Sequence, residues 1–279
     1  MPHINPAMRE SVGALCAKLP GADEPTYKGT CFFVQVTSTT GQVVDYLVTA
    51  RHVLDGLRSA GGGAYLRVNR GRVGQFNQGV IDEPIPTEGW LLHDDPHVDL
   101  AVLPLGFAEA LGDDHPAEVF RFLKLRLDRL SSTRPPEMRW PPLEGEDILF
   151  IAMTNQFVGK NANLPTVRRG GIALVTDEPL DGKYGPAQYY VIEGQVYPGN
   201  SGSPVWVYYR GGLVMLGVLA FAYPTEEEIK RRPTGTDIYY NFGLSLVVPI
   251  EKVDEIVNSE TEKKRRESAA QGQQPGLGV

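Results

Sequence analysis

The sequence predicts an all-β protein built from two β-rich halves, and three observations support this fold class. Most apolar residues fall in short runs broken by glycine, proline, asparagine and aspartate, which is the pattern of strands joined by turns. Helical periodicity is confined to short segments. A proline-rich stretch near the middle of the chain disfavours both helix and central strand, so it indicates a linker.

The apolar runs predict strands along the whole chain. They lie at residues 12–18, 30–37, 43–49, 64–68, 100–104, 147–153, 170–175, 189–196, 205–209, 213–222 and 244–249. Short helices are expected at residues 52–58 and 251–258. Segments 107–111 and 117–125 fit either a helix or another structure.

The linker covers residues 128–144 and divides the chain into a first half, residues 1–127, and a second half, residues 145–260. Residues 261–279 are charged and then rich in glutamine and glycine, with almost no apolar side chains. Such a segment buries too little apolar surface to offset the entropy lost on ordering, so we expect a disordered tail.

Composition limits the partners of the protein. The 279 residues carry a net charge of −7, with a pI near 5.3, which argues against nucleic acid or an anionic membrane as a partner. No apolar stretch is long enough to span a bilayer. Residues 1–10 lack the basic-then-apolar pattern of a secretion signal, so a cytoplasmic location is expected.

The chain has two cysteines, Cys16 and Cys31, which excludes the framework of several disulfides found in many secreted domains. They fall in neighbouring predicted strands, where a single bridge is geometrically conceivable. Two reduced, buried thiols are the favoured interpretation in a reducing compartment.

The most informative motif is Tyr-Pro-Gly-Asn-Ser-Gly-Ser-Pro at residues 197–204. Ser201 stands between Asn200 and Gly202, two residues that tolerate unusual backbone angles. A nucleophilic serine needs such a turn, because its hydroxyl must project while backbone N–H groups point at the same spot. Ser201 is therefore a candidate nucleophile, and an ordinary turn serine is the alternative.

Two upstream segments supply the partners that activate a serine hydroxyl. His52 follows an apolar run and the residues Thr-Ala-Arg at 49–51. Asp99 directly precedes the apolar run Leu-Ala-Val-Leu at 100–103. An ionised carboxylate at the edge of a buried strand requires a partner such as His52.

Neighbouring residues offer alternatives to Asp99. Asp94 and Asp95 lie just upstream, in what we expect to be an exposed loop. His93 and His97 lie close to these carboxylates and with them suggest a metal site. Because the segment lacks an established ligand spacing, a surface loop is favoured, and no metal or cofactor is expected.

Taken together, the motifs resemble those of the trypsin-like (chymotrypsin-fold) serine peptidases, in particular the bacterial branch. The chain carries Thr-Ala-Arg-His, Asp-Leu-Ala-Val and Pro-Gly-Asn-Ser-Gly-Ser-Pro in the order of the chymotrypsin-type triad. Residues 163–170 also match a segment common in these bacterial members. The resemblance covers residues 11–257 and implies two six-stranded antiparallel β-barrels with a C-terminal helix, and an active site between the barrels.

The resemblance assigns a role to each candidate. Ser201 is the nucleophile, His52 is the general base and then the general acid, and Asp99 orients the imidazole. The backbone N–H groups of Gly199 and Ser201 form the oxyanion hole, and a glycine can turn its peptide inward. Asn200 stands where digestive relatives carry the aspartate that pairs with a newly cleaved N-terminus, so their activation switch is not expected.

Substrate specificity follows from the resemblance as well. Gln195 takes the floor of the primary specificity pocket, and Gly243 lines its far wall. Ala220 and Ala222 belong to the strand that pairs with the substrate backbone. A neutral floor predicts an apolar or small uncharged side chain before the scissile bond. A solvent-facing strand residue is the alternative for Gln195.

These assignments predict a serine endopeptidase that cleaves protein or peptide substrates through an acyl-enzyme. Ester hydrolysis is a plausible side activity of the same triad. A latent or catalytically silent module that binds peptides is the alternative from another class. A peptidase in the cytoplasm needs restraint, which an activating partner protein would provide.

Overall fold

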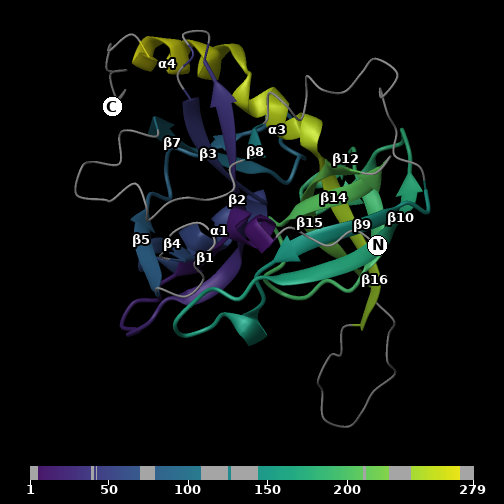
Figure 1. The fold of residues 1–279 in the computed structure, drawn as a ribbon, viewed down its shortest axis with the longest axis horizontal. Coiled ribbons are helices and arrows are strands. Elements are labelled where there is room, and N and C mark those ends of the chain that lie inside the picture. Colours follow the sequence, from purple (N-terminus) through teal and green to yellow (C-terminus); the bar gives the residue numbers. More distant parts are fainter. Residues whose placement is uncertain are drawn as a thin grey trace.

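A computed structural model of the protein describes residues 6–38, 41, 43–69, 79–107, 125–126, 144–209, 212–225 and 240–270. The expected linker 128–144, the ambiguous segments 107–111 and 117–125, and residues 271–279 of the expected tail lie wholly or mostly outside this part of the chain. Strands dominate both halves, which confirms the predicted β class (Figure 1).

The first half is a strand-rich sheet with one helix. Its elements are η1 (Pro6–Ser11), β1 (Val12–Ala17), β2 (Thr26–Thr37), β3 (Val43–Thr49), α1 (Arg51–Ala60), β4 (Ala64–Asn69), β5 (Val80–Ile85), β6 (Leu91–Leu92), β7 (Ala101–Phe107) and β8 (Leu125–Arg126). The strand order is β5-β4-β1-β2-β3-β7-β6, with β8 parallel to β2. Among the described strands this path does not close, so the first of the two expected barrels is not seen.

The second half contains a closed barrel of six strands, as expected. Its elements are β9 (Asp147–Ala152), η3 (Asn155–Phe157), β10 (Thr166–Val175), β11 (Leu180–Gly182), β12 (Gly185–Ala187), β13 (Tyr190–Gly194), β14 (Pro204–Tyr209), β15 (Gly212–Thr225) and β16 (Tyr240–Pro249), followed by α3 (Ile250–Val257) and α4 (Glu260–Ala270). The barrel runs β10-β13-β16-β15-β14-β9, and β11 pairs with β12 in a separate hairpin.

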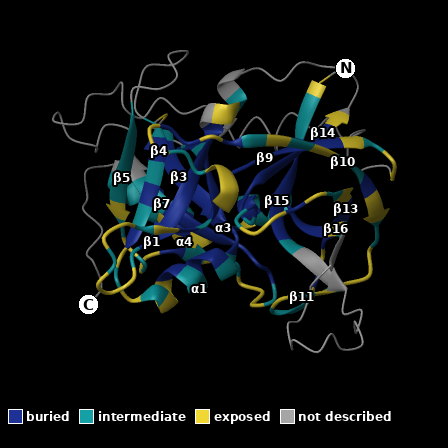
Figure 2. Cartoon of the chain, turned by 90° about the horizontal axis from the view of Figure 1, so that it is seen from below, coloured by how far each residue is buried: buried dark blue, intermediate teal, exposed yellow. Residues whose placement is uncertain are grey.

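The two halves share a hydrophobic core. One cluster of buried side chains joins Phe32 and Val48 of the first sheet to Leu246 and Val248 of the barrel, and to Val253 of α3. Figure 2 shows buried segments running through both halves. Because apolar side chains from both halves leave water together, the core holds the halves against each other.

Helix α4 corrects the prediction of a disordered tail for residues 261–270. Glu262 is 2% exposed and Arg266 is 5% exposed. Glu262 accepts a hydrogen bond from the hydroxyl of buried Tyr46 at 2.7 Å, and Arg266 Nη1 donates to the same hydroxyl oxygen at 3.0 Å. The composition is misleading because polar contacts hold this helix, rather than an apolar face.

Other expectations are settled by single observations. The helices predicted at 52–58 and 251–258 are α1 and α3. Cys16 and Cys31 are both buried and free, in agreement with the favoured interpretation. Burial raises the pKa of the Cys16 thiol to about 12. No helix among the described residues is long and apolar enough to cross a membrane.

Candidate active site

His52 and Asp99 form a close pair with two contacts. His52 Nδ1 lies 2.7 Å from Asp99 Oδ2, and the backbone N–H of His52 donates to Asp99 Oδ1 at 2.9 Å. Asp99 is 1% exposed. With Nδ1–H donated to the carboxylate, the other ring nitrogen, Nε2, is left as a proton acceptor.

Local structure explains why the pair forms. Strand β3 ends at Thr49, extended Ala50 precedes the helix, and α1 begins at Arg51 without a side-chain cap from Ala50. The first N–H groups of a helix have no partner within the helix, so the carboxylate of Asp99 serves as a cap from a distant part of the chain. Residue Ala101 pairs with Thr49 across β3 and β7, which brings the ends of the two strands together.

Among the described residues, the competing acidic and histidine residues form no hydrogen bond or ion pair with His52 or Asp99. Asp94 and Asp95 are exposed, as expected for a surface loop. Asp95 accepts a hydrogen bond from the backbone N–H of His97 at 2.9 Å, and His93 Nε2 lies 2.7 Å from a carboxylate oxygen of Glu255 on α3. These contacts support the preference for Asp99 as the partner of His52.

The loop that carries Ser201 packs against the first half. The Ser201 carbonyl accepts from the Thr30 N–H at 2.9 Å, and Gly202 N–H donates to the Leu219 carbonyl at 2.7 Å. A β-carbon on Gly202 would lie 2.0 Å from the Thr30 carbonyl oxygen and 2.3 Å from Thr49 Oγ1, so the loop touches the strand that leads to His52. In the described part of the chain, no hydrogen bond joins Ser201 Oγ to His52.

The segment from Gly199 to Ser201 is fixed by one glycine with a positive φ and by the side chain of Asn200. Gly199 has a φ of 96°, a value that favours glycine. The Asn200 side chain donates to the Met153 carbonyl at 2.7 Å and accepts from the Tyr197 N–H at 2.8 Å. Among the described residues, the N–H groups of Gly199 and Ser201 donate to no protein acceptor.

The predicted specificity residues gather at one end of the barrel, where β16 lies between β13 and β15. A β-carbon on Gly243 would lie 3.8 Å from the carbonyl oxygen of Gly194, the residue before Gln195. Gln195 is exposed and accepts a hydrogen bond from Tyr197 at 3.2 Å. Ala222 pairs in register with Ser245 of β16.

The predicted role of Ala220 concerns its backbone, and the structure locates its side chain elsewhere. Its side chain is fully buried in the shared core, because it points inward from β15. Only its backbone is therefore suited to the pairing with substrate that the sequence predicts.

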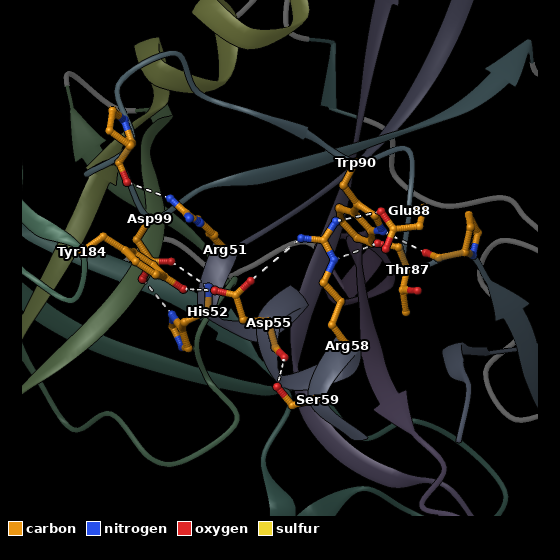
Figure 3. A network of polar contacts seen from close by, with 12 residues as sticks. Arg51, His52, Asp55, Arg58, Ser59, Thr87, Glu88, Trp90, Asp99 and Tyr184 are labelled. Carbon is orange, nitrogen blue, oxygen red and sulfur yellow. Dashed lines mark hydrogen bonds and ion pairs between the residues drawn. The ribbon is translucent and has the colours of Figure 1, made fainter. Parts of the chain in front are cut away.

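A group of side chains around α1 carries no recognisable sequence signal (Figure 3). Tyr184, in the turn between β11 and β12, donates its hydroxyl proton to Asp55, and the guanidinium of Arg51 lies 4.3 Å from the centre of its ring. Burial, the bond to Asp55 and the charge of Asp99 raise the pKa of Tyr184. Through Tyr184 the second half contacts the helix that carries His52. No local pattern around residue 184 predicts this contact.

Comparisons with known proteins agree with this fold. The model of the trypsin-like peptidase domain matches residues 29–214, and the chain therefore belongs to the trypsin-like peptidase family. No curated protein matches the chain significantly.

Solved structures of bacterial proteases are similar to this chain. The apo MamO protease domain from Magnetospirillum magneticum has 14% identity and a TM-score of 0.54, over 90% of this chain and 97% of that one. The active form of the Rv3671c protease from M. tuberculosis has 16% identity and a TM-score of 0.49, over 91% of this chain and 83% of that one. At 14% identity, the likeness to MamO demonstrates a shared fold alone.

Proposed function

We propose that the protein is a serine endopeptidase in which Ser201, His52 and Asp99 form a catalytic triad. The observation that carries the proposal is the double contact of Asp99 with His52, at 2.7 Å and 2.9 Å, beside the docked loop of Ser201. A buried carboxylate that orients an imidazole leaves Nε2 ready to accept a proton from a serine hydroxyl.

The proposed reaction has two stages, acylation of Ser201 and hydrolysis of the acyl-enzyme, and the same catalytic groups act in both. His52 Nε2 takes the proton of Ser201 Oγ as this oxygen attacks the carbonyl carbon of the scissile peptide. The N–H groups of Gly199 and Ser201 stabilise the negative oxygen of the tetrahedral intermediate. His52 then donates the proton to the leaving amine, and water hydrolyses the acyl-enzyme by the same route.

The substrate proposed for this site is an extended protein segment with a neutral side chain before the scissile bond. Gln195 and Gly243 lie at the same end of the barrel and offer no charge to a basic side chain there. The β15 backbone near Ala220 and Ala222 is available to pair with the segment as an added strand. A peptide library that varies this position tests the preference, and a dominant preference for Lys or Arg would contradict it.

A latent or silent peptide-binding module is the second candidate. The observation that favours it is the missing hydrogen bond between Ser201 Oγ and His52 among the described residues. In that case the Ser201 hydroxyl is not activated in the resting protein, and an activating partner or the substrate itself aligns the pair.

Fluorophosphonate labelling read by intact mass distinguishes the two candidates, because the probe requires an activated serine. We expect one adduct on the wild-type protein and none on Ser201→Ala. A wild-type protein that stays unlabelled would contradict the active peptidase and favour the latent or binding module. Cleavage of a peptide library then separates a peptidase from an esterase.

A further inference from the structure

Two hydroxyl side chains from the first half meet the carbonyl oxygen of Gly199. Tyr27 Oη lies 2.5 Å from this oxygen and Thr30 Oγ1 lies 2.9 Å from it. The two hydroxyl oxygens are themselves 2.9 Å apart. The three oxygens share only two hydroxyl protons. Since the two hydroxyl groups cannot both donate to each other, at least one of them donates to the Gly199 carbonyl.

Thr30 is held firmly in this position. Its side chain is fully buried, and Oγ1 accepts a hydrogen bond from the Met153 N–H at 3.0 Å. Its carbonyl accepts from Thr49 Oγ1 at 2.7 Å, and its N–H donates to the Ser201 carbonyl at 2.9 Å. Thr30 therefore contacts the loop on both sides of Asn200.

Tyr27 restricts the loop by its ring as well as its hydroxyl. A β-carbon on Gly199 would lie 2.2 Å from Cε1 of Tyr27, so the ring lies directly against the backbone at this residue. Burial raises the pKa of Tyr27 well above its ordinary value, which keeps the hydroxyl protonated and able to donate.

We propose that Tyr27 and Thr30 are positioning residues for the oxyanion hole. The carbonyl of Gly199 shares its planar peptide unit with the N–H of Asn200, and the carbonyl of Ser201 shares its unit with the N–H of Gly202. By binding these two carbonyls, Tyr27 and Thr30 fix both units and so restrict backbone rotation at Gly199 and Ser201, whose own N–H groups are the proposed oxyanion donors. Donors stabilise an oxyanion strongly only when they are oriented before the reaction. The resting protein is then preordered at this loop without a partner. The inference rests on the proposed function.

Variants of the full chain test this role by the rate of fluorophosphonate labelling at Ser201, resolved into the inactivation rate constant and the probe affinity. Losing an oxyanion donor outright lowers a rate by about 10²–10³-fold, so losing an orienting hydroxyl should cost less, about tenfold. We expect Tyr27→Phe and Thr30→Val to lower the inactivation rate constant about tenfold with unchanged affinity. Thr30→Ser keeps the hydroxyl and should restore the wild-type rate. Tyr208→Phe, at a tyrosine that is 37% exposed on β14, is the matched control and should not change it.

The outcomes separate this inference from the proposed function. A labelled wild-type protein whose Tyr27→Phe and Thr30→Val variants react at the wild-type rate would overturn the positioning role alone. A wild-type protein without an adduct overturns the proposed function. In that case, amide hydrogen exchange in the segment 197–203 tests whether Tyr27 and Thr30 order the loop. Faster exchange in Tyr27→Phe than in the wild type supports the preordered loop, and equal exchange overturns it. If Thr30→Val does not fold, the test compares the labelling rates of Tyr27→Phe and Thr30→Ser with that of the wild type.

Discussion

At the scale of single residues, Asp99 serves two groups with one carboxylate. One oxygen binds the His52 imidazole and the other binds the N–H of the same residue at the start of α1. Orientation of the ring and of its backbone therefore depends on the same side chain. A substitution that keeps the size of the Asp99 side chain but changes its hydrogen-bonding groups tests the contact with the imidazole separately from packing.

Asp99→Asn should nearly abolish activity while the protein stays folded. The amide can still accept from the backbone N–H, but its NH₂ group faces Nδ1 and forces the proton onto Nε2. With the wrong tautomer, His52 no longer accepts the serine proton, and the expected loss is about 10⁴-fold in kcat. The labelling rate measures it, with Asp95→Asn on the exposed loop as the control. A labelling rate within tenfold of the wild type would contradict the assigned role.

At the scale of elements, the β11–β12 hairpin connects the second half to the helix of His52. Tyr184 contacts Arg51 and Asp55, which lie one turn apart on α1. A β-carbon on Gly185 would lie 2.8 Å from Cδ2 of His97, so the hairpin also packs against the loop that leads to Asp99. The hairpin thus braces both elements that supply the histidine–aspartate pair.

Tyr184→Phe removes the hydrogen bond to Asp55 and keeps the ring over Arg51. A hydrogen bond contributes about 1 kcal/mol net, which corresponds to a labelling rate lowered roughly fivefold. Tyr184→Ala also removes the ring and should lower the rate further. Labelling kinetics measure whether the rate falls from the wild type to Tyr184→Phe and further to Tyr184→Ala, and thermal unfolding checks that the variants are folded. Equal rates for wild type, Tyr184→Phe and Tyr184→Ala would show that the hairpin does not brace the site.

Helix α4 is a second element whose contribution to stability can be measured. Truncation after Ser259 removes both Glu262 and Arg266, and with them the hydrogen bonds that they form with the Tyr46 hydroxyl. A hydrogen bond to a charged group contributes about 1.5–3 kcal/mol net, so the free energy of unfolding should fall by at least about 1.5 kcal/mol. Denaturant unfolding measures it, with a truncation after Ala270 that keeps α4 whole as the control. Identical unfolding curves for both truncations would contradict the docking of α4.

At the scale of the whole molecule, stability should decline at alkaline pH through Tyr46. Burial first, and the charge of Glu262 next, raise the pKa of Tyr46 from 10.0 to about 12. The folded state thus holds the phenolic proton more tightly than the unfolded state. The stability contribution is complete below pH 10 and is lost as the pH rises toward 12.

The comparison of wild type with Tyr46→Phe tests this alkaline dependence. The stability difference between the two proteins should shift in favour of the phenylalanine variant between pH 10 and 12, because only tyrosine titrates there. Unfolding in denaturant at a series of pH values measures the difference. Parallel stability curves over this range would show that Tyr46 does not contribute.

Much of the candidate site could be predicted because its residues lie in short segments with local constraints. His52 follows a strand directly, Asp99 stands before another strand, and Ser201 needs the flexible neighbours that the motif provides. Pairing of β3 with β7 then brings His52 and Asp99 together. The roles of Ser201, Gln195 and Gly243 stay predictions, as does the cytoplasmic location.

The sequence by itself determined the β class, the closed barrel of the second half, the two short helices and the candidate catalytic residues. The β class and the helices follow from periodicity and turn residues, which act over a few neighbouring positions, whereas the barrel and the catalytic assignments follow from the resemblance that the ordered motifs carry. Only the tertiary structure decided that Tyr27 and Thr30 bind the Gly199 carbonyl, that Tyr184 grips α1, and that α4 is ordered. The physical reason is distance along the chain, because Tyr46 and Glu262 are separated by 216 positions and no local pattern encodes a hydrogen bond between them.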